Sequence, residues 1–214
     1  MEKMTMYYSQ AGQDQFVLFC LRKRNGTFVE IGSFDPVEIN NTYILEKEFQ
    51  WSGLMIEKDA SQLPKYQEKR PRSNHLIQDA TTVCYAEQFT KLGFPAVIDY
   101  LMIDLEVRSQ ATIQCLRKLE SEVMANYRFA VVTFEHDIYR SNYLNRHKYS
   151  KTRRESRQIF DRHGYVRVFS DVKNRGNPYE DWYVHPDGVD MSRIEPLITD
   201  ESLEWTDIVR KFCS

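Results

Sequence analysis

The sequence predicts a doubly wound α/β fold whose sheet is mostly parallel and ends in an antiparallel C-terminal edge hairpin. Short apolar segments alternate with helical segments through most of the chain, a pattern typical of right-handed βαβ crossovers. Segment 96–106 is nearly continuous in apolar residues, as strands buried on both faces are. The last two strand-like segments follow each other with no helical segment between them. These observations define the fold class.

The elements follow in order from the hydrophobic pattern. A helix is expected over 12–26, with an apolar face, basic residues near its C-terminus and a stop at Gly26. Parallel strands are expected over 27–32, 53–57, 74–80, 96–106 and 128–137, helices over 40–49, 109–120 and 149–164, and hairpin strands over 165–172 and 179–186. In the helix over 109–120, Ile113, Leu116 and Leu119 are spaced to face inward.

Length and composition indicate one globular domain. The 214 residues suffice for a single α/β domain over 1–214, and 42% apolar residues suffice for a packed core. The net charge of −2 argues against binding nucleic acid through overall charge. No apolar run is long enough for a membrane span, and residues 1–10 lack signal-peptide features. With Cys20, Cys84, Cys115 and Cys213 too scattered for a zinc site or a redox pair, a cytoplasmic protein with reduced thiols is expected.

Carboxylates stand at the ends of five consecutive predicted strands. Ligands of doubly wound sheets bind at this edge, so a set of acids there favours a site over the alternative of isolated loop and helix-capping residues. The residues at these strand ends are Glu30 and Gly32, Glu57, Asp79, Asp104 with Glu106, and Glu135 with His136 and Asp137.

Glu57 and Gly32 together indicate the kind of ligand. An acid at the end of the second strand is the usual partner of ribose hydroxyls, and Glu57 lies 25 residues beyond Gly32. A pyrophosphate-binding loop carries three glycines, whereas this loop carries Gly32 alone. A ligand with ribose and adenine but no phosphate fits both facts, and a cationic one fits an acidic cleft. S-adenosylmethionine is such a ligand. The alternatives for Glu57 are a salt bridge with Lys58 or a helix N-cap.

Four blocks of the sequence resemble the FkbM-like S-adenosylmethionine-dependent methyltransferases. These blocks are SQAGQD at 9–14, FVEIGSFDP at 28–36, NNTYILE at 40–46 and WSGLMIEKD at 51–59, with looser matches at 100–106 and around DWYVHP. The resemblance implies a Rossmann-like methyltransferase sheet and transfer of a methyl group to a hydroxyl, typically of a sugar or a polyketide. The sequence departs from the family pattern at Val107, where glycine is usual, and at Gln110, near the position of an expected acid.

The same resemblance implies a role for each matching residue. Glu30, Gly32 and Ser33 would form the cofactor loop, with Asn41 and Thr42 on the following helix. Glu57 would hold the ribose, Lys58 would sit beside the adenine, and Asp79 and Ala80 would face the adenine edge. Asp104 would lie near the reacting methyl group, and Gln10 would help to close the site.

Methyl transfer to a hydroxyl requires a base or a metal that favours the alkoxide. His136 is the first candidate for this base, because Glu135 and Asp137 flank it and raise its expected pKa, and Asp104 is the second. The alternative for His136 is a structural role at the strand end. Asp104 and Glu135 are also candidate ligands for a hard divalent cation such as Mg²⁺.

Segment 140–167 is strongly basic, with nine Lys and Arg residues against two acids. A solvated helix face is the simpler interpretation. The functional one is a docking surface for an anionic acceptor such as a nucleotide-linked sugar. Nucleic acid is less favoured, because no Asn-Pro-Pro-Tyr-like motif follows the fourth strand.

Three functional hypotheses therefore follow from the sequence. The first is an O-methyltransferase acting on a sugar hydroxyl in glycan biosynthesis. The second is a methyltransferase with a nucleic-acid or other anionic acceptor. The third is a non-catalytic interaction module that keeps the methyltransferase fold, suggested by Val107 and Gln110.

Overall fold

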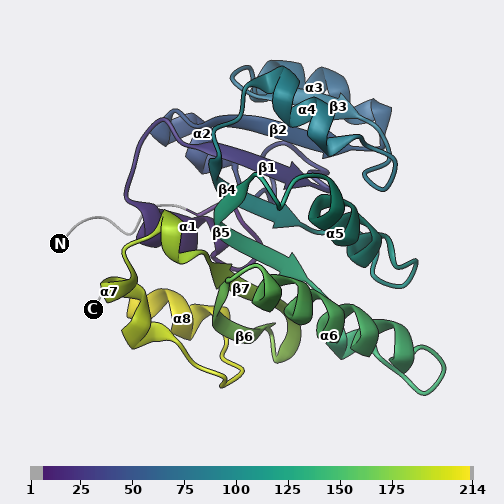
Figure 1. The fold of residues 1–214 in the computed structure, drawn as a ribbon, viewed down its shortest axis with the longest axis vertical. Coiled ribbons are helices and arrows are strands. Elements are labelled where there is room, and N and C mark those ends of the chain that lie inside the picture. The colour runs from purple at the N-terminus through teal and green to yellow at the C-terminus, as the bar shows by residue number, and fades with distance from the viewer. Residues whose placement is uncertain (1–6, 213–214) are drawn as a thin grey trace.

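The computed structural model describes residues 7–212 and contains one seven-stranded sheet in the order β3-β2-β1-β4-β5-β7-β6 (Figure 1). The expectations for the first six residues of the N-terminal stretch and for Cys213 lie outside this range. Neighbouring strands from β3 to β5 run parallel, and β7 runs antiparallel to both β5 and β6. The predicted fold class, a doubly wound and mostly parallel sheet with an antiparallel edge pair, is confirmed.

Helices alternate with strands as far as β5, including α3 and α4, neither of which was among the predicted helices. The strands are β1 Thr27–Ile31, β2 Ser52–Glu57, β3 Asn74–Ile77, β4 Val97–Ile103, β5 Arg128–Glu135, β6 Val166–Asn174 and β7 Asn177–Val184. The α-helices are α1 Gln13–Leu21, α2 Tyr43–Phe49, α3 Leu63–Lys69, α4 Tyr85–Leu92, α5 Ala111–Glu122, α6 Arg146–Arg162, α7 Met191–Ile194 and α8 Trp205–Lys211, with short 3₁₀ turns over Ala60–Gln62, Ile138–Arg140, Pro186–Gly188 and Glu195–Leu197.

The expectation that the hairpin ends the chain was wrong, because α7 and α8 follow it. They pack Ile194 and Ile208 into the same buried cluster as Phe16 of α1. The β6–β7 hairpin has a two-residue turn, Arg175 and Gly176, and both residues have a positive φ. A two-residue turn needs this backbone conformation for its twist to match that of the flanking strands.

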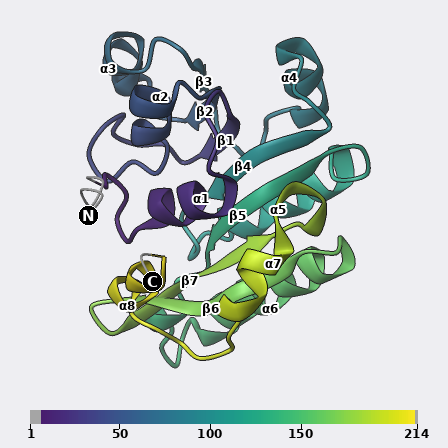
Figure 2. The same ribbon diagram turned by 90° about the vertical axis from the view of Figure 1, so that its left-hand side faces the viewer.

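Two apolar layers cover the faces of the sheet. One layer packs α4, α5 and α6 on β-strand residues such as Val29 and Ile31, and the other packs α1, α2, α3, α7 and α8 on residues such as Phe28. Figure 2 shows α1, α7 and α8 in front of the sheet. The alternation of Phe28 and Val29 between the layers follows from the two-residue period of a strand.

The strand order places the topological switch point between β1 and β4. From β1 the chain moves outward to β2 and β3, then returns to β4 on the other side of β1. The loops that leave β1 and β4 therefore diverge, and the carboxyl ends of these two strands border a crevice. Ligands of such sheets bind in this crevice. Among residues 7–212, no helix is both long and apolar enough to cross a membrane.

Candidate active site

A cavity of about 1030 Å³ lies at the switch point, on the carboxyl side of the strands. Ten of the residues expected in the site line it: Gln10, Gly32, Ser33, Asn41, Glu57, Lys58, Asp79, Ala80, Asp104 and Glu135. The strand order thus brings together side chains from loops that are far apart in the sequence.

Gly32 allows a close backbone approach, as the sequence suggested, but the group that lies close to it is the backbone of Asp104 rather than a ligand. It has φ +87°, and a Cβ there would lie 1.9 Å from the carbonyl oxygen of Asp104. The N–H groups of Gly32 and Ser33 both donate to the carbonyl of Ile56, at 2.9 and 3.2 Å. Because these N–H groups are already used, the turn offers no cradle of free donors to a pyrophosphate.

Glu57 is held in place by backbone donors at the end of β2. Its Oε2 accepts a hydrogen bond from Phe34 N at 3.1 Å, and its Oε1 accepts one from Asp59 N at 2.9 Å. The structure shows neither the salt bridge with Lys58 nor the helix N-cap that the sequence left open. Each oxygen keeps a second lone pair, so the carboxylate can still accept from two vicinal hydroxyls.

Glu30 and Thr42 do not line the cavity, contrary to expectation. Both side chains are completely buried, and they lie among the polar groups that support the loop between β1 and α2. Glu30 points away because strand residues alternate sides, and its Oε2 accepts from Asn40 Nδ2 at 3.2 Å. In the structure they therefore support the loop and do not line the cavity.

Arg70 organises this support, which we call the Arg70 network. Its fully buried guanidinium donates to Glu46 Oε2 at 2.8 Å, to Asn40 Oδ1 at 2.9 Å and to Thr42 Oγ1 at 2.6 Å. Glu30 Oε2 lies 3.9 Å from Arg70, and Glu30 Oε1 has no hydrogen-bond partner. Burial raises the pKa of Glu30, and Arg70 opposes that rise only in part.

Asn41 remains available for a ligand. Its Oδ1 is buried without a hydrogen-bond partner, and the residue lines the cavity. A buried carbonyl oxygen without a donor is costly, so a ligand N–H or ammonium group at this point would be favoured.

Asp104, Glu135 and Asp137 form an acidic cluster at the ends of β4 and β5. Burial raises the pKa of Asp104, and the hydrogen bond with Glu135 lowers it. Burial and the neighbouring charge of Asp104 raise the pKa of Glu135 well above its usual range. Two such close carboxyls resist ionising together, so the pair binds a proton more tightly than an isolated carboxyl does. Arg140 lies 3.1 Å from Asp137.

His136, the first candidate for the base, does not reach the cavity. Glu135 and Asp137 line the cavity, but the side chain of His136 between them points to the opposite side. The strand geometry continues here because the N–H groups of His136 and Asp137 both donate to the carbonyl of Tyr179. His136 is completely buried, and its Nδ1 accepts from Ile138 N at 3.2 Å. This assignment is therefore corrected: the structural alternative holds, and Asp104 becomes the candidate base.

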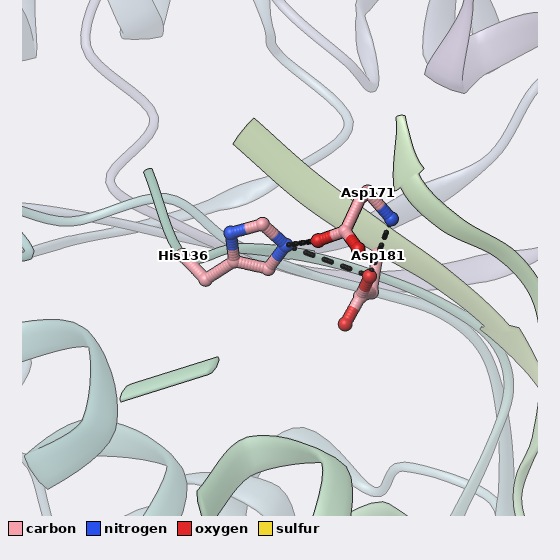
Figure 3. Close-up of side chains that lie close together, drawn as sticks. All are labelled: His136, Asp171 and Asp181. Carbon is pink, nitrogen blue, oxygen red and sulfur yellow. Dashed lines mark hydrogen bonds and ion pairs between the residues drawn. The ribbon is translucent and has the colours of Figure 1, made fainter. Parts of the chain in front are cut away.

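The imidazole of His136 instead joins what we call the His136 network (Figure 3). Its Nε2 lies 3.3 Å from Asp171 Oδ1 and 3.5 Å from Asp181 Oδ1. Arg153 pairs with Asp171, and Arg157 donates to both oxygens of Asp181 at 2.7 and 2.8 Å. Burial lowers the pKa of His136, but the two carboxylates more than offset this and raise it.

Charge balance argues against a metal ion in the His136 network. His136, Asp171 and Asp181 form the one group of three or more possible metal ligands among the described residues. The two aspartates are already neutralised by Arg153 and Arg157, so a divalent cation would add two uncompensated charges. The predicted metal ligands, Asp104 and Glu135, lie in the cavity but belong to no such cluster among residues 7–212.

A second cavity of about 910 Å³ adjoins the first. The two share Gln10, Ile39, Asp104, Glu135, Asp137 and Arg140. The acidic cluster thus faces both spaces, one framed by the loops of β1 to β3 and one framed by the β6–β7 turn and α8.

Most basic residues of segment 140–167 are already engaged. Arg140, Arg153, Arg157, Arg162 and Arg167 form ion pairs, and Lys148 donates to the carbonyl of Arg108. The partners come from segments as distant as Glu120 and Asp200, which a local charge count does not reveal.

Sequence reasoning missed several residues that shape the site. The roles of Arg70 and Asp181 were hidden because their ion-pair partners lie 24 or more residues away along the chain. Gln110, read as a replaced acid, has a structural role: its Nε2 donates to the carbonyls of Val107 and Lys148 and to Thr152 Oγ1. It thereby ties the start of α5 to α6.

The fold of this chain is similar to that of solved structures of Rossmann-like methyltransferases. A Clostridium thermocellum chain assigned as an rRNA-methylase matches with a TM-score of 0.56 at 14% identity, over 85% of this chain and 97% of that chain. A Klebsiella pneumoniae chain assigned as an O-methyltransferase matches with a TM-score of 0.55 at 14% identity, over 86% and 83%. A TehB-like SAM-dependent methyltransferase from Corynebacterium glutamicum matches with a TM-score of 0.51 at 10% identity, over 83% and 88%.

At such identities the likeness establishes the fold, while function has to be argued from the site. No protein-family model matches the sequence, and no curated protein matches it either.

Proposed function

We propose that this chain is a cytoplasmic S-adenosylmethionine-dependent O-methyltransferase of the FkbM-like type that methylates a sugar hydroxyl in glycan biosynthesis. The observation that carries the proposal is the cavity at the switch point, which is lined by several acids and whose Gly32 and Ser33 N–H groups are already bonded to the carbonyl of Ile56. Both properties suit a cationic, phosphate-free nucleoside. The resemblance of the sequence to FkbM-like enzymes supports the sugar acceptor.

The cavity residues fit this cofactor end to end. Glu57 would hold the ribose hydroxyls, and Asp79 with Ala80 would border the adenine. The unpartnered Oδ1 of Asn41 would accept from the amino group of the methionine moiety. When bound, the cofactor supplies an electrophilic methyl group on a sulfonium.

The chain's own contribution to the chemistry would be positioning and proton removal. The acceptor oxygen must lie in line with the methyl group. The acidic cluster faces both cavities, at the place where the acceptor oxygen and the methyl group would meet. Asp104, which lines both cavities, would take the hydroxyl proton as the oxygen attacks. A divalent cation on Asp104 and Glu135 would serve the same end by favouring the alkoxide.

Engagement of the basic segment in ion pairs supports a sugar over a nucleic acid. Five of its arginines are bound to carboxylates of the chain itself, so the charge available to phosphates is much smaller than the sequence suggests.

Calorimetric titration with S-adenosylmethionine and S-adenosylhomocysteine, with and without Mg²⁺, tests the cofactor. We expect micromolar binding that weakens about 30-fold or more in Glu57→Ala, since about 2 kcal/mol or more is lost with the charged hydrogen bonds to the ribose. Glu48→Ala, which removes an exposed carboxylate outside both cavities, is the matched control. Absence of binding by the wild-type protein would refute the proposal.

A further inference from the structure

The second cavity is built by the two ends of the described chain. Tyr7, Ser9 and Gln10 form one wall, and Trp205 with Thr206 at the start of α8 forms another. The β6–β7 turn closes the space with Asn174, Arg175 and Asn177. Segments distant in sequence therefore meet around one space that opens onto Asp104 and Glu135.

Trp205 is fixed in this wall by its neighbours. Its ring lies edge to face with Tyr7, at a centroid distance of 5.2 Å and an angle of 70°. A Cβ at Gly12 would lie 2.6 Å from Val209 Cγ2 and 3.2 Å from the Trp205 ring, so only glycine lets the N-terminal segment lie this close to α8. The indole is thus held in a defined orientation rather than free to adopt many rotamers.

The chemistry of the wall matches a polyhydroxylated ring. Aromatic faces pack against the C–H face of a sugar, while amides and carboxyls bond its hydroxyls. The cavity offers Trp205, Tyr7 and Tyr139 for the first role, and Asn174, Asn177 and the acidic cluster for the second.

The charges of the lining residues also limit which acceptors the second cavity can bind. Asp104, Glu135, Asp137 and Glu204 line the cavity together with two arginines. Arg140 is already paired with Asp137 at 3.1 Å, which leaves Arg175 on the exposed turn. An anionic group inside this space would face carboxylates and lose affinity.

From this arrangement we infer that the second cavity is the acceptor site and takes an uncharged sugar ring, packed on Trp205, with one hydroxyl directed at Asp104 and Glu135. This inference rests on the proposed function and names its acceptor. Trp205 is then a determinant of acceptor specificity, and Asn177 a contributor of hydrogen bonds to hydroxyls.

Tryptophan fluorescence offers a direct test. The chain has three tryptophans, of which Trp51 and Trp182 are completely buried. Only the partly exposed Trp205 is open to a collisional quencher. The protein, saturated with S-adenosylhomocysteine, is titrated with a panel of neutral methyl glycosides and the matching methyl uronosides, and acrylamide quenching is recorded.

We expect at least one neutral glycoside to protect Trp205 from acrylamide in a saturable way and to bind about 10-fold tighter than its uronoside. Trp205→Phe should abolish the fluorescence response and weaken binding about 10-fold by calorimetry, with S-adenosylhomocysteine affinity unchanged. Asn177→Ala, an exposed substitution at the start of β7, should weaken glycoside binding about 3-fold and keeps the test valid if the first variant misfolds. Tyr143→Phe, outside both cavities, is the matched control.

Two results would overturn the inference: no glycoside protects Trp205 although S-adenosylhomocysteine binds, or the uronoside binds as well as the neutral sugar. Failure of S-adenosylhomocysteine itself to bind would count against the proposed function instead, so the two failures are distinguishable.

Discussion

The Arg70 network and the His136 network occupy opposite sides of the switch point and balance their charges differently. In the first, one arginine serves the carboxyls of Glu46 and Glu30. In the second, two arginines and a histidine surround Asp171 and Asp181. The first network therefore has a single cation, although Glu46 also accepts from Arg72 N and Ser73 Oγ, whereas Asp171 and Asp181 in the second each face more than one cation.

The two networks also set pKa values in opposite directions. Burial outweighs Arg70 and raises the pKa of Glu30. In the His136 network the cations outweigh burial, and the pKa values of Asp171 and Asp181 fall well below the usual range. Burial alone thus does not decide the charge state of an acid; the number of facing cations does.

Arg70→Met is expected to have the largest effect on stability. It leaves Glu46 buried without its cation and frees the loop that carries Asn40 and Asn41, at a cost of about 3–5 kcal/mol. Chemical denaturation should show this loss, and cofactor binding should fall with it. Arg72→Ala is the matched control, because the Arg72 guanidinium donates to the carbonyl of Gln50 at the surface. Equal losses in both variants would contradict the central role of Arg70.

Asp181→Asn should cost less, about 2–3 kcal/mol, although Asp181 is just as buried. Arg157 keeps Asp171 at 3.1 Å, and His136 keeps the same carboxylate at 3.3 Å. Urea unfolding of both variants in one buffer gives the comparison. A larger loss in Asp181→Asn than in Arg70→Met would show that shared partners do not protect the His136 network.

Much of the fold and of the lining of the switch-point cavity was predictable, because the signals were local. Strand periodicity placed Glu57 and Asp104 at strand ends, and parallel order then brought those ends together. The same periodicity applied to residues 135–137 places the side chain of His136 on the opposite side from Glu135 and Asp137. Arg70, Asp171 and Asp181 were not predictable, since their roles depend on partners brought close only by the completed fold.

The pH dependence of stability separates the networks by sign. Glu30, with a raised folded-state pKa, binds more protons when folded, so its contribution is lost as pH rises above about 4.5. Asp181, with a lowered pKa, contributes above about 4 and loses that contribution as pH falls toward its folded-state pKa. Relative to wild type, Glu30→Gln should therefore gain thermal stability with rising pH, by about 2–4 °C per pH unit within the titration window.

Thermal unfolding of the wild type, Glu30→Gln and Asp181→Asn between pH 3 and pH 8 measures these differences. The deficit of Asp181→Asn should be constant above about pH 5 and shrink below about pH 4. Parallel pH profiles for all three proteins would mean that neither acid has a shifted pKa.

The smallest effect is expected at the surface of α6, where the Arg162 guanidinium lies 2.8 Å from Glu120. The arginine side chain is 57% exposed, so water and salt screen the pair, and side-chain entropy offsets most of its attraction. Arg162→Ala should change the free energy of unfolding by about 0.5 kcal/mol or less, against several for Arg70→Met. An arginine–glutamate contact of the same length is thus expected to be weak at the surface and strong when both side chains are buried. A surface loss as large as the buried one would mean that exposure is not what separates them.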